Sequence, residues 1–122
     1  NPMKKILIVD DEPNIVMSLE YTFKKNDFEV FIARDGIEAL EIVKSNFPDV
    51  IILDVMMPLV DGYATLEHIR KDSNLSHTKV IFLSAKNKAS DIEKGLALGA
   101  DAYLTKPFSI KKVVEQVLEL LQ

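Results

Sequence analysis

Short apolar runs alternate along this chain with longer segments of helical periodicity, and this alternation restricts the possible folds more than any other feature. Three of the runs are four residues long and rich in Ile and Val: Ile6–Val9, Val50–Leu53 and Val80–Leu83. Runs without intervening polar residues are typical of strands buried on both faces, as in parallel sheets covered by helices. Each run is therefore predicted to be a strand of such a sheet.

Two more segments are predicted to form strands nearer the edges of the sheet. Phe28–Ala33 mixes Glu29 among apolar residues, and Ala102–Leu104 is short and precedes Pro107. Apolar residues at helical spacing follow each strand, at Ile15–Phe23, Ile37–Phe47, Tyr63–Ile69, Ser90–Leu98 and Ile110–Leu121. Strict alternation of strand and helix predicts one α/β domain with a parallel sheet and helices on both faces.

Residues at the helix ends support these boundaries. Pro13 suits the first turn of the first helix, Gly99 suits the end of the fourth, and Ser109 is a good N-cap for the last. One apolar face of the second helix is expected to comprise Ile37, Leu40, Val43 and Phe47, with Pro48 closing the segment.

Composition and charge exclude several classes of protein. The 122 residues are 48% hydrophobic and 28% charged, as in an average globular domain. The chain has no cysteine, which excludes disulfides, thiolate metal sites and a cysteine nucleophile. A net charge of −4 without a basic stripe argues against direct nucleic-acid contact. No apolar stretch approaches the ~18 residues of a membrane span, and none continues as a signal peptide, so we expect a cytoplasmic protein without membrane contact.

Polar side chains stand just beyond the predicted strands. The first strand leads into Asp10 and Asp11, the third into Asp54, the fourth into Ser84 and the fifth into Lys106. Taken singly, each also suits a helix cap, a turn or a solvated surface. Carboxyl ends of parallel strands share one rim, however, and ligands of open α/β sheets bind there, where the strand order reverses. If the order is 2-1-3-4-5, the three aspartates converge on one crevice.

Three carboxylates repel one another and need a compensating cation. An all-oxygen site without His or Cys suits Mg²⁺, which commonly takes one or two carboxylates and keeps waters for a phosphate. A metal ion, a lysine and an in-line nucleophile are the parts of a phosphoryl-transfer site, and a carboxylate can itself be that nucleophile. Asp54 is the best candidate because it follows the middle strand, and the Met56 carbonyl is expected to complete the metal shell.

Four motifs occur in order between Met3 and Leu121. They are IVDDEP at 8–13, LDVMMP at 53–58 with Gly62, LSA at 83–85, and GADAYLTKPF at 99–108. Together they resemble the response regulator receiver domains, the CheY-like phosphoacceptor domains of two-component systems. The resemblance implies a flavodoxin-like (βα)5 three-layer sandwich whose five-stranded parallel sheet has the order 2-1-3-4-5. We expect the receiver domain to span residues 3–122, with residues 1–2 a remnant of cloning.

The resemblance also implies how the site binds its metal and its phosphoryl group. Asp54 is expected to accept a phosphoryl group from the phosphohistidine of a sensor kinase. Asp11 and Asp54 are expected to bind Mg²⁺ through their carboxylates, Met56 through its carbonyl, and Asp10 through a bound water. Lys106 is expected to contact the phosphoryl group.

Two further residues are implied to switch the domain. Ser84, where many relatives carry Thr, is expected to hydrogen-bond the phosphoryl group, and Tyr103 to turn inward with it. The peptide bond between Lys106 and Pro107 is expected to be cis. The resulting shift of the fourth helix, fifth strand and last helix is expected to control an output domain or a partner protein.

Partners follow from the same resemblance. They are a sensor histidine kinase or phosphotransfer protein, an output domain or downstream protein, and a second copy if phosphorylation drives homodimerisation. The chain is not expected to be an enzyme beyond catalysing its own phosphorylation and dephosphorylation.

Three alternatives remain open at this stage. A magnesium-dependent phosphatase with an aspartyl nucleophile usually carries a second acid where this chain has Met56. A flavodoxin-like cofactor binder needs a phosphate-cradling loop after the first strand, where this chain has Asp10, Asp11 and Glu12. A docking module that has lost phosphorylation would not need the complete set of motif residues.

Overall fold

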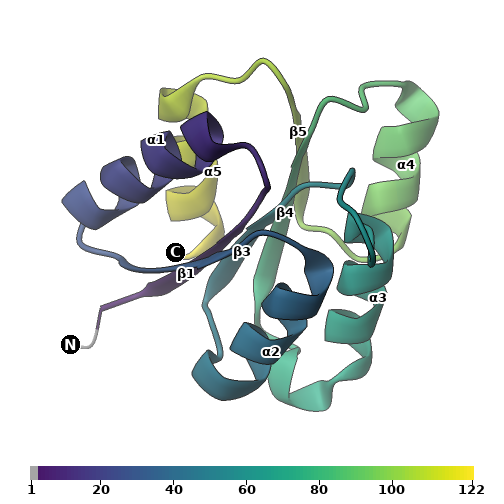
Figure 1. Ribbon diagram of the computed structural model, residues 1–122, viewed down its shortest axis with the longest axis horizontal. Coiled ribbons are helices and arrows are strands. Elements are labelled where there is room, and N and C mark those ends of the chain that lie inside the picture. The colour runs from purple at the N-terminus through teal and green to yellow at the C-terminus, as the bar shows by residue number, and fades with distance from the viewer. Residues whose placement is uncertain (1–2) are drawn as a thin grey trace.

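A five-stranded parallel sheet runs through the centre of the molecule, with the order β2-β1-β3-β4-β5 (Figure 1). The computed structural model describes residues 3–122, so the interpretation of residues 1–2 as a cloning remnant lies outside the described residues. The strands are β1 (Lys5–Val9), β2 (Glu29–Ala33), β3 (Val50–Leu53), β4 (Lys79–Ser84) and β5 (Ala102–Thr105). The predicted strand order is confirmed, with β2 and β5 at the edges.

Five helices cover the two faces of the sheet. They are α1 (Pro13–Lys25), α2 (Gly36–Asn46), α3 (Gly62–Lys71), α4 (Ala89–Ala97) and α5 (Ile110–Leu120). Helices α1 and α5 lie on one face, and α2, α3 and α4 lie on the other (Figure 1). A short 3-10 helix at Ser73–Leu75 was not predicted. Within residues 3–122, no helix is long and apolar enough to span a membrane.

The solidly apolar strands are explained by two separate cores, one on each face of the sheet. Leu7 and Val9 point into the core beneath α2 and α3, while Ile6 and Ile8 point into the core beneath α1 and α5. Because each inner strand supplies side chains to both cores, polar residues have no exposed face to occupy. The described apolar residues of β3 are all buried for the same reason.

The second helix buries only part of the face that its periodicity predicts. Its buried residues are Gly36, Ala39 and Val43. By contrast, Ile37 is 45% exposed, and Phe47 lies beyond the helix end, 53% exposed at a φ of 48°. Gly36 approaches the Val60 carbonyl so closely that a Cβ there would lie 2.5 Å from it. The expected face is therefore right at Val43 and at Leu40, which packs against the core, and wrong at Ile37 and Phe47. Small residues on the buried side allow α2 to approach its neighbours closely.

Caps end several helices where the sequence predicts. The Ser109 hydroxyl accepts a hydrogen bond from the Lys112 N–H at the start of α5. Gly99 follows the end of α4 at a φ of 111°, a conformation that favours glycine. Ser109 begins α5 just after β5, at the rim formed by the carboxyl ends of the strands, whereas Gly99 leads into β5 at the opposite edge of the sheet.

Candidate functional site

Backbone hydrogen bonds fix the position of the first residue beyond β1 and beyond β3. The Asp10 N–H donates to the Ala33 carbonyl of β2, and the Asp54 N–H donates to the Val9 carbonyl of β1. Parallel pairing therefore continues one residue past β1 and β3. As a result, both carboxylates are held at the rim of the sheet, where they are buried.

Lys106 approaches the same point from the loop after β5. Its N–H donates to the Ser84 carbonyl, which anchors the backbone at the end of β4. Its ammonium nitrogen lies 3.1 Å from an Asp10 oxygen and 3.3 Å from an Asp54 oxygen. The peptide bond between Lys106 and Pro107 is cis, as the resemblance implied. The structure thus brings together Asp10, Asp54 and Lys106 from three different strands.

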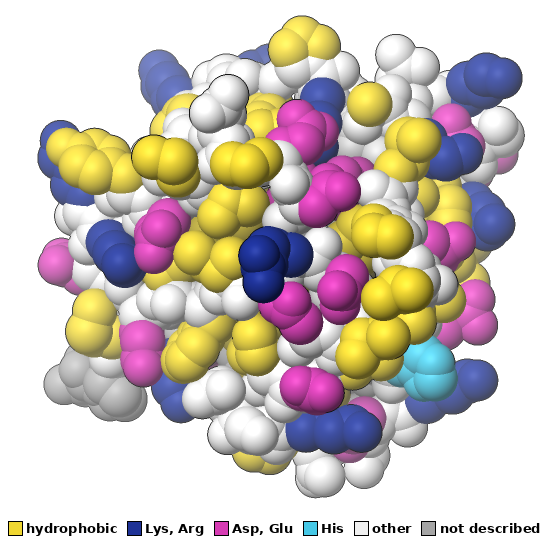
Figure 2. Space-filling view, viewed as in Figure 1, with side chains coloured by type: hydrophobic (Ala, Val, Ile, Leu, Met, Phe, Trp, Pro, Cys, Tyr) yellow, Lys and Arg dark blue, Asp and Glu magenta, His cyan; other side chains and the backbone are white. Residues whose placement is uncertain are grey.

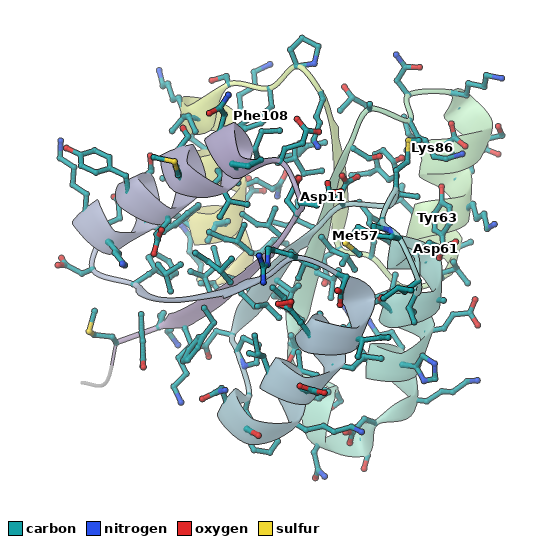
Figure 3. All side chains as sticks on the ribbon, viewed as in Figure 1. Asp11, Met57, Asp61, Tyr63, Lys86 and Phe108 are labelled. Atoms are coloured by element: carbon teal, nitrogen blue, oxygen red, sulfur yellow. The ribbon has the colours of Figure 1, made fainter. Side chains whose placement is uncertain are left out.

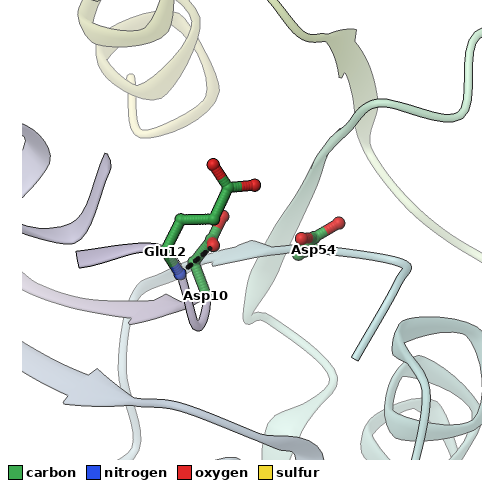
Figure 4. Close-up of side chains that lie close together, drawn as sticks. All are labelled: Asp10, Glu12 and Asp54. Carbon is green, nitrogen blue, oxygen red and sulfur yellow. Dashed lines mark hydrogen bonds between the residues drawn. The ribbon is translucent and has the colours of Figure 1, made fainter. Parts of the chain in front are cut away.

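A third carboxylate, Glu12, joins this cluster. Its Oε1 lies 2.9 Å from the Lys106 nitrogen, and its backbone N–H donates to Asp10 Oδ1 at 2.9 Å. Carboxylate oxygens of Asp10, Glu12 and Asp54 all lie within 4.8 Å of one another (Figure 4). Sequence reasoning did not include Glu12 in the site. The signal was present, since Glu12 completes the acidic run that begins at Asp10.

Asp11 is placed differently from its neighbours. It lies in the loop after β1 (Figure 3), where its side chain is exposed. It is not a member of the carboxylate group formed by Asp10, Glu12 and Asp54. Asp10 and Glu12, two residues apart in this loop, both contact Lys106, and Asp11 lies between them in the sequence. The role that the resemblance implies for Asp11 therefore stays a prediction.

Burial and the charges of the cluster together shift two pKa values. Burial raises the pKa of the Asp10 carboxyl above its ordinary range, and the negative charge of Asp54 adds to the rise. The Glu12 N–H and the Lys106 ammonium oppose it. Burial also tends to lower the pKa of Lys106, but hydrogen bonds with Glu12 and Asp10 and the nearby carboxylate charges raise it overall. Lys106 therefore remains a fixed positive charge at neutral pH.

The two oxygens of Asp54 have different surroundings. Oδ1 accepts a hydrogen bond from the Met56 N–H at 3.1 Å, and Oδ2 faces Lys106. The Met56 side chain is exposed, so it is the backbone of this residue that contacts the site. The Gly62 N–H donates to the Val55 carbonyl, and this hydrogen bond closes the loop between β3 and α3.

Ser84 and Tyr103 are linked through a residue of the loop after β4. The buried Ser84 hydroxyl accepts a hydrogen bond from the Lys86 N–H at 3.2 Å, and the Tyr103 hydroxyl donates to the Lys86 carbonyl at 2.7 Å. Burial, reinforced by the nearby Tyr63, raises the pKa of Tyr103 to about 12. Tyr103 therefore stays protonated and able to donate at neutral pH.

The residues present suit a hard divalent cation. Carboxylates of Asp10 and Asp54 and the backbone of the loop after β3 offer only oxygen ligands, which Mg²⁺ prefers. The Lys106 ammonium already lies among these carboxylates, so the cluster is one that attracts positive charge. In the upper middle of the face seen in Figure 2, acidic side chains gather between hydrophobic ones.

Comparison with known proteins gives a consistent result. The family model described as the response regulator receiver domain matches residues 6–118. The chain is 41% identical over 119 residues to the alkaline phosphatase synthesis transcriptional regulatory protein PhoP of Bacillus subtilis, covering 98% of this chain and 49% of that protein. It is 43% identical to the probable transcriptional regulator ycf27 of Cyanophora paradoxa, covering 98% and 48%. The chain thus spans about half the length of these curated relatives.

Solved structures agree with the sequence comparison. The receiver domain of the Francisella response regulator 1452 superposes with a TM-score of 0.89 at 39% identity, covering 97% of this chain and 96% of that one. The chemotaxis response regulator CheY4 of Vibrio cholerae superposes with a TM-score of 0.92 at 32% identity, covering 98% and 100%. The flavodoxin-like fold predicted from the motifs is confirmed.

Proposed function

The chain belongs to the family of response regulator receiver domains, which are phosphorylation switches of two-component signalling, and from this premise we propose that Asp54 is its phosphoacceptor. The observation that supports Asp54 most strongly is its placement at the end of the central strand. One carboxylate oxygen is held by a backbone N–H, while the other faces the Lys106 ammonium. Family membership also decides against a cofactor-binding flavodoxin.

The proposed chemical step is transfer of a phosphoryl group from a phosphohistidine. An Asp54 oxygen forms a bond to phosphorus as the bond from phosphorus to the imidazole nitrogen breaks, and the imidazole leaves with that electron pair. Lys106 is 10% exposed in its side chain, so its charge is poorly screened by water and attracts the phosphoryl oxygens strongly. We propose Lys106 as the residue that orients the group in line.

Mg²⁺ is the proposed cofactor, and when bound it neutralises phosphate charge that Lys106 alone cannot offset. The ligands proposed are the carboxylates of Asp11 and Asp54 and the Met56 carbonyl, with Asp10 acting through a water. The carboxylate group seen in the structure supports an acidic metal site that includes Asp10 and Asp54. The exposed Asp11 lies next to Asp10 in the chain, within the same loop.

Phosphorylation adds a charge of about −1.5 to −2 and three acceptor oxygens next to Lys106 and Ser84. We propose that the Ser84 hydroxyl then donates to the phosphoryl group, which changes its contact with the Lys86 N–H. Tyr103 responds because it binds the carbonyl of the same residue. Tyr103 belongs to β5 and packs against α4, so the proposed output surface is α4, β5 and α5.

The proposed partners are a histidine kinase or phosphotransfer protein upstream and an output domain or downstream protein. The curated relatives are named as transcriptional regulators, which supports an output in gene regulation. We propose no direct nucleic-acid contact for this domain, and homodimerisation through the α4-β5-α5 surface on phosphorylation. Its catalysis is limited to its own phosphorylation and dephosphorylation.

Intact mass spectrometry tests the assignment of Asp54. The protein is incubated with acetyl phosphate and Mg²⁺, and wild type is expected to gain one phosphoryl group. Asp54→Asn is expected to gain none, because its amide is not a nucleophile. Asp27→Asn, an isosteric change in an exposed turn at a φ of 66°, serves as the matched control and is expected to behave as wild type. One phosphoryl group on Asp54→Asn, or none on wild type, would overturn the proposal.

A further inference from the structure

Glu12 occupies the solvent side of the phosphorylation site. The side chains of Asp10, Asp54 and Lys106 are 3%, 6% and 10% exposed, whereas that of Glu12 is 57% exposed. The three buried groups therefore form the floor of the site, and Glu12 is the member of the cluster that is open to solvent. A phosphodonor that approaches Asp54 from solvent approaches the Glu12 carboxylate as well.

The Glu12 carboxylate is not used to stabilise its own helix. Glu12 is the N-cap of α1, but its side chain accepts no hydrogen bond from the helix N–H groups. Its carboxylate reaches instead to Lys106, and that 2.9 Å contact is the shortest of the three that the ammonium makes. A local capping role therefore does not explain the position of this side chain.

Glu12 also borders an open apolar hollow next to the site. Ile15, Pro107 and Phe108 line a hollow of ≈ 450 Å³ together with Glu12 and Lys106. Phe108 is labelled in Figure 3 above the start of α1, on the α1 side of the rim. Among the residues that line this hollow, Glu12 carries the only negative charge and Lys106 the only positive one. The charge of this hollow is therefore set by two side chains in direct contact, and both also belong to the cluster around Asp54.

We propose that Glu12 is a specificity-determining residue that selects phosphodonors by charge. Its negative charge on the solvent side of the site disfavours the approach of dianionic donors more than that of monoanionic ones. This inference rests on the proposed function, because it assumes that Asp54 is phosphorylated. It goes further in assigning the donor preference of the site to one residue outside the floor of the cluster.

The expected size of the effect of Glu12 on the rate follows from its distance to the donor and from screening by water. The carboxylate oxygens of Glu12 and Asp54 lie within 4.8 Å, so an incoming phosphoryl group passes about 5–6 Å from the Glu12 charge. For a largely solvated group at that distance, one unit of donor charge changes the rate roughly threefold. The effect is expected to shrink as salt is added, because the Glu12 side chain is exposed.

Two small donors of different charge separate this effect from structural ones. Acetyl phosphate is a dianion at pH 7.5 and releases acetate when Asp54 attacks phosphorus and the bond to the bridging oxygen breaks. Phosphoramidate carries one net negative charge and releases ammonia when the phosphorus–nitrogen bond breaks. Both reactions leave the same acyl phosphate on Asp54, so the ratio of their rates cancels effects on the nucleophile itself.

The experiment measures this ratio for wild type, Glu12→Gln, Glu12→Asp and Glu20→Gln. Glu20→Gln removes one negative charge from the same helix, where Glu20 pairs with Lys24 away from the site. The Mg²⁺ affinity of each variant is first measured by calorimetry, so that all rates are taken at saturating Mg²⁺. Thermal unfolding of each variant checks that the fold is intact.

Glu12→Gln is expected to raise the acetyl phosphate to phosphoramidate ratio roughly threefold at low salt and less at high salt. Glu12→Asp keeps the charge but shortens its reach to Lys106, so its ratio is expected to match wild type, as is that of Glu20→Gln. An unchanged or lower ratio in Glu12→Gln would overturn the inference. A Glu12→Asp ratio equal to that of Glu12→Gln would also overturn it, by assigning the effect to the Lys106 contact. If wild type accepts no phosphoryl group from either donor, the proposed function itself fails.

Discussion

Replacing Asp10 by Asn is expected to stabilise the fold at neutral pH. Asp10 is nearly fully buried in a cluster where three carboxylates share one ammonium. At an effective dielectric constant of about 20, its attraction to Lys106 amounts to about 5 kcal/mol, and its repulsion by Asp54 to about 3 kcal/mol. The exposed Glu12 adds about 1 kcal/mol of repulsion, so the pairwise terms nearly cancel.

What remains is the cost of burying the Asp10 charge. We expect the Asn side chain to remove that cost and to keep the hydrogen bond from the Glu12 N–H, giving a gain of about 1–2 kcal/mol at pH 7.5. The pKa of Asp10 is raised in the folded state, so its ionisation weakens folding. The gain is therefore expected to be largest above the folded-state pKa and to disappear as the pH falls toward the unfolded value of ~3.9.

Urea unfolding followed by circular dichroism measures this gain. For a slope of about 1–3 kcal/mol per molar urea, the midpoint is expected to rise by roughly 1 M at pH 7.5 and by less at pH 5. Asp27→Asn is the control, because it removes one exposed carboxylate elsewhere. A lower midpoint for Asp10→Asn at pH 7.5, or a difference that does not depend on pH, would refute the reasoning.

Three more predictions follow from other parts of the structure. Mg²⁺ at 100 times its dissociation constant is expected to raise the free energy of unfolding of wild type by about 2.7 kcal/mol. Urea unfolding with and without the ion measures this change, and an unchanged free energy would contradict an acidic metal site. Gly62→Ala is expected to cost more than about 3 kcal/mol, because its Cβ would lie 2.3 Å from the Asp54 carbonyl; a thermal midpoint equal to wild type would disprove this. Tyr63→Phe removes the hydrogen bond from the Tyr63 hydroxyl to the Asp91 carbonyl at 3.1 Å. A loss of about 1 kcal/mol in the free energy of unfolding and faster hydrogen exchange in the first turn of α4 are expected. Unchanged exchange would show that this hydrogen bond does not hold α4.

The strands of the sheet were predictable because burial on both faces leaves a signature in short segments of the sequence. Each inner strand faces two cores, and only an unbroken apolar run such as Val50–Leu53 satisfies both. The face of α2 was not predictable from periodicity alone. Burial of Gly36 and Ala39 depends on how closely α3 and its preceding loop approach, which is a property of the tertiary packing.

The candidate site, too, was predictable in part from the sequence. Equivalent strand ends predicted that Asp10, Asp54 and Lys106 would come together, because parallel strands carry their carboxyl ends to one rim. The inclusion of Glu12 depends on the direction of side chains in the loop after β1. Successive residues of that loop point differently, so Glu12 contacts Lys106 while Asp11 remains outside the group. A sequence run of three acids does not reveal which members face inward.

Locating the phosphoryl group on the chain tests the role of Asp54 directly. The phosphorylated protein is reduced with borohydride, which converts an aspartyl phosphate to homoserine, and its peptides are sequenced by mass spectrometry. Homoserine is expected at position 54 in wild type and at no position in Asp54→Asn. Homoserine at position 10 or 11 of wild type, with Asp54 unmodified, would contradict that role.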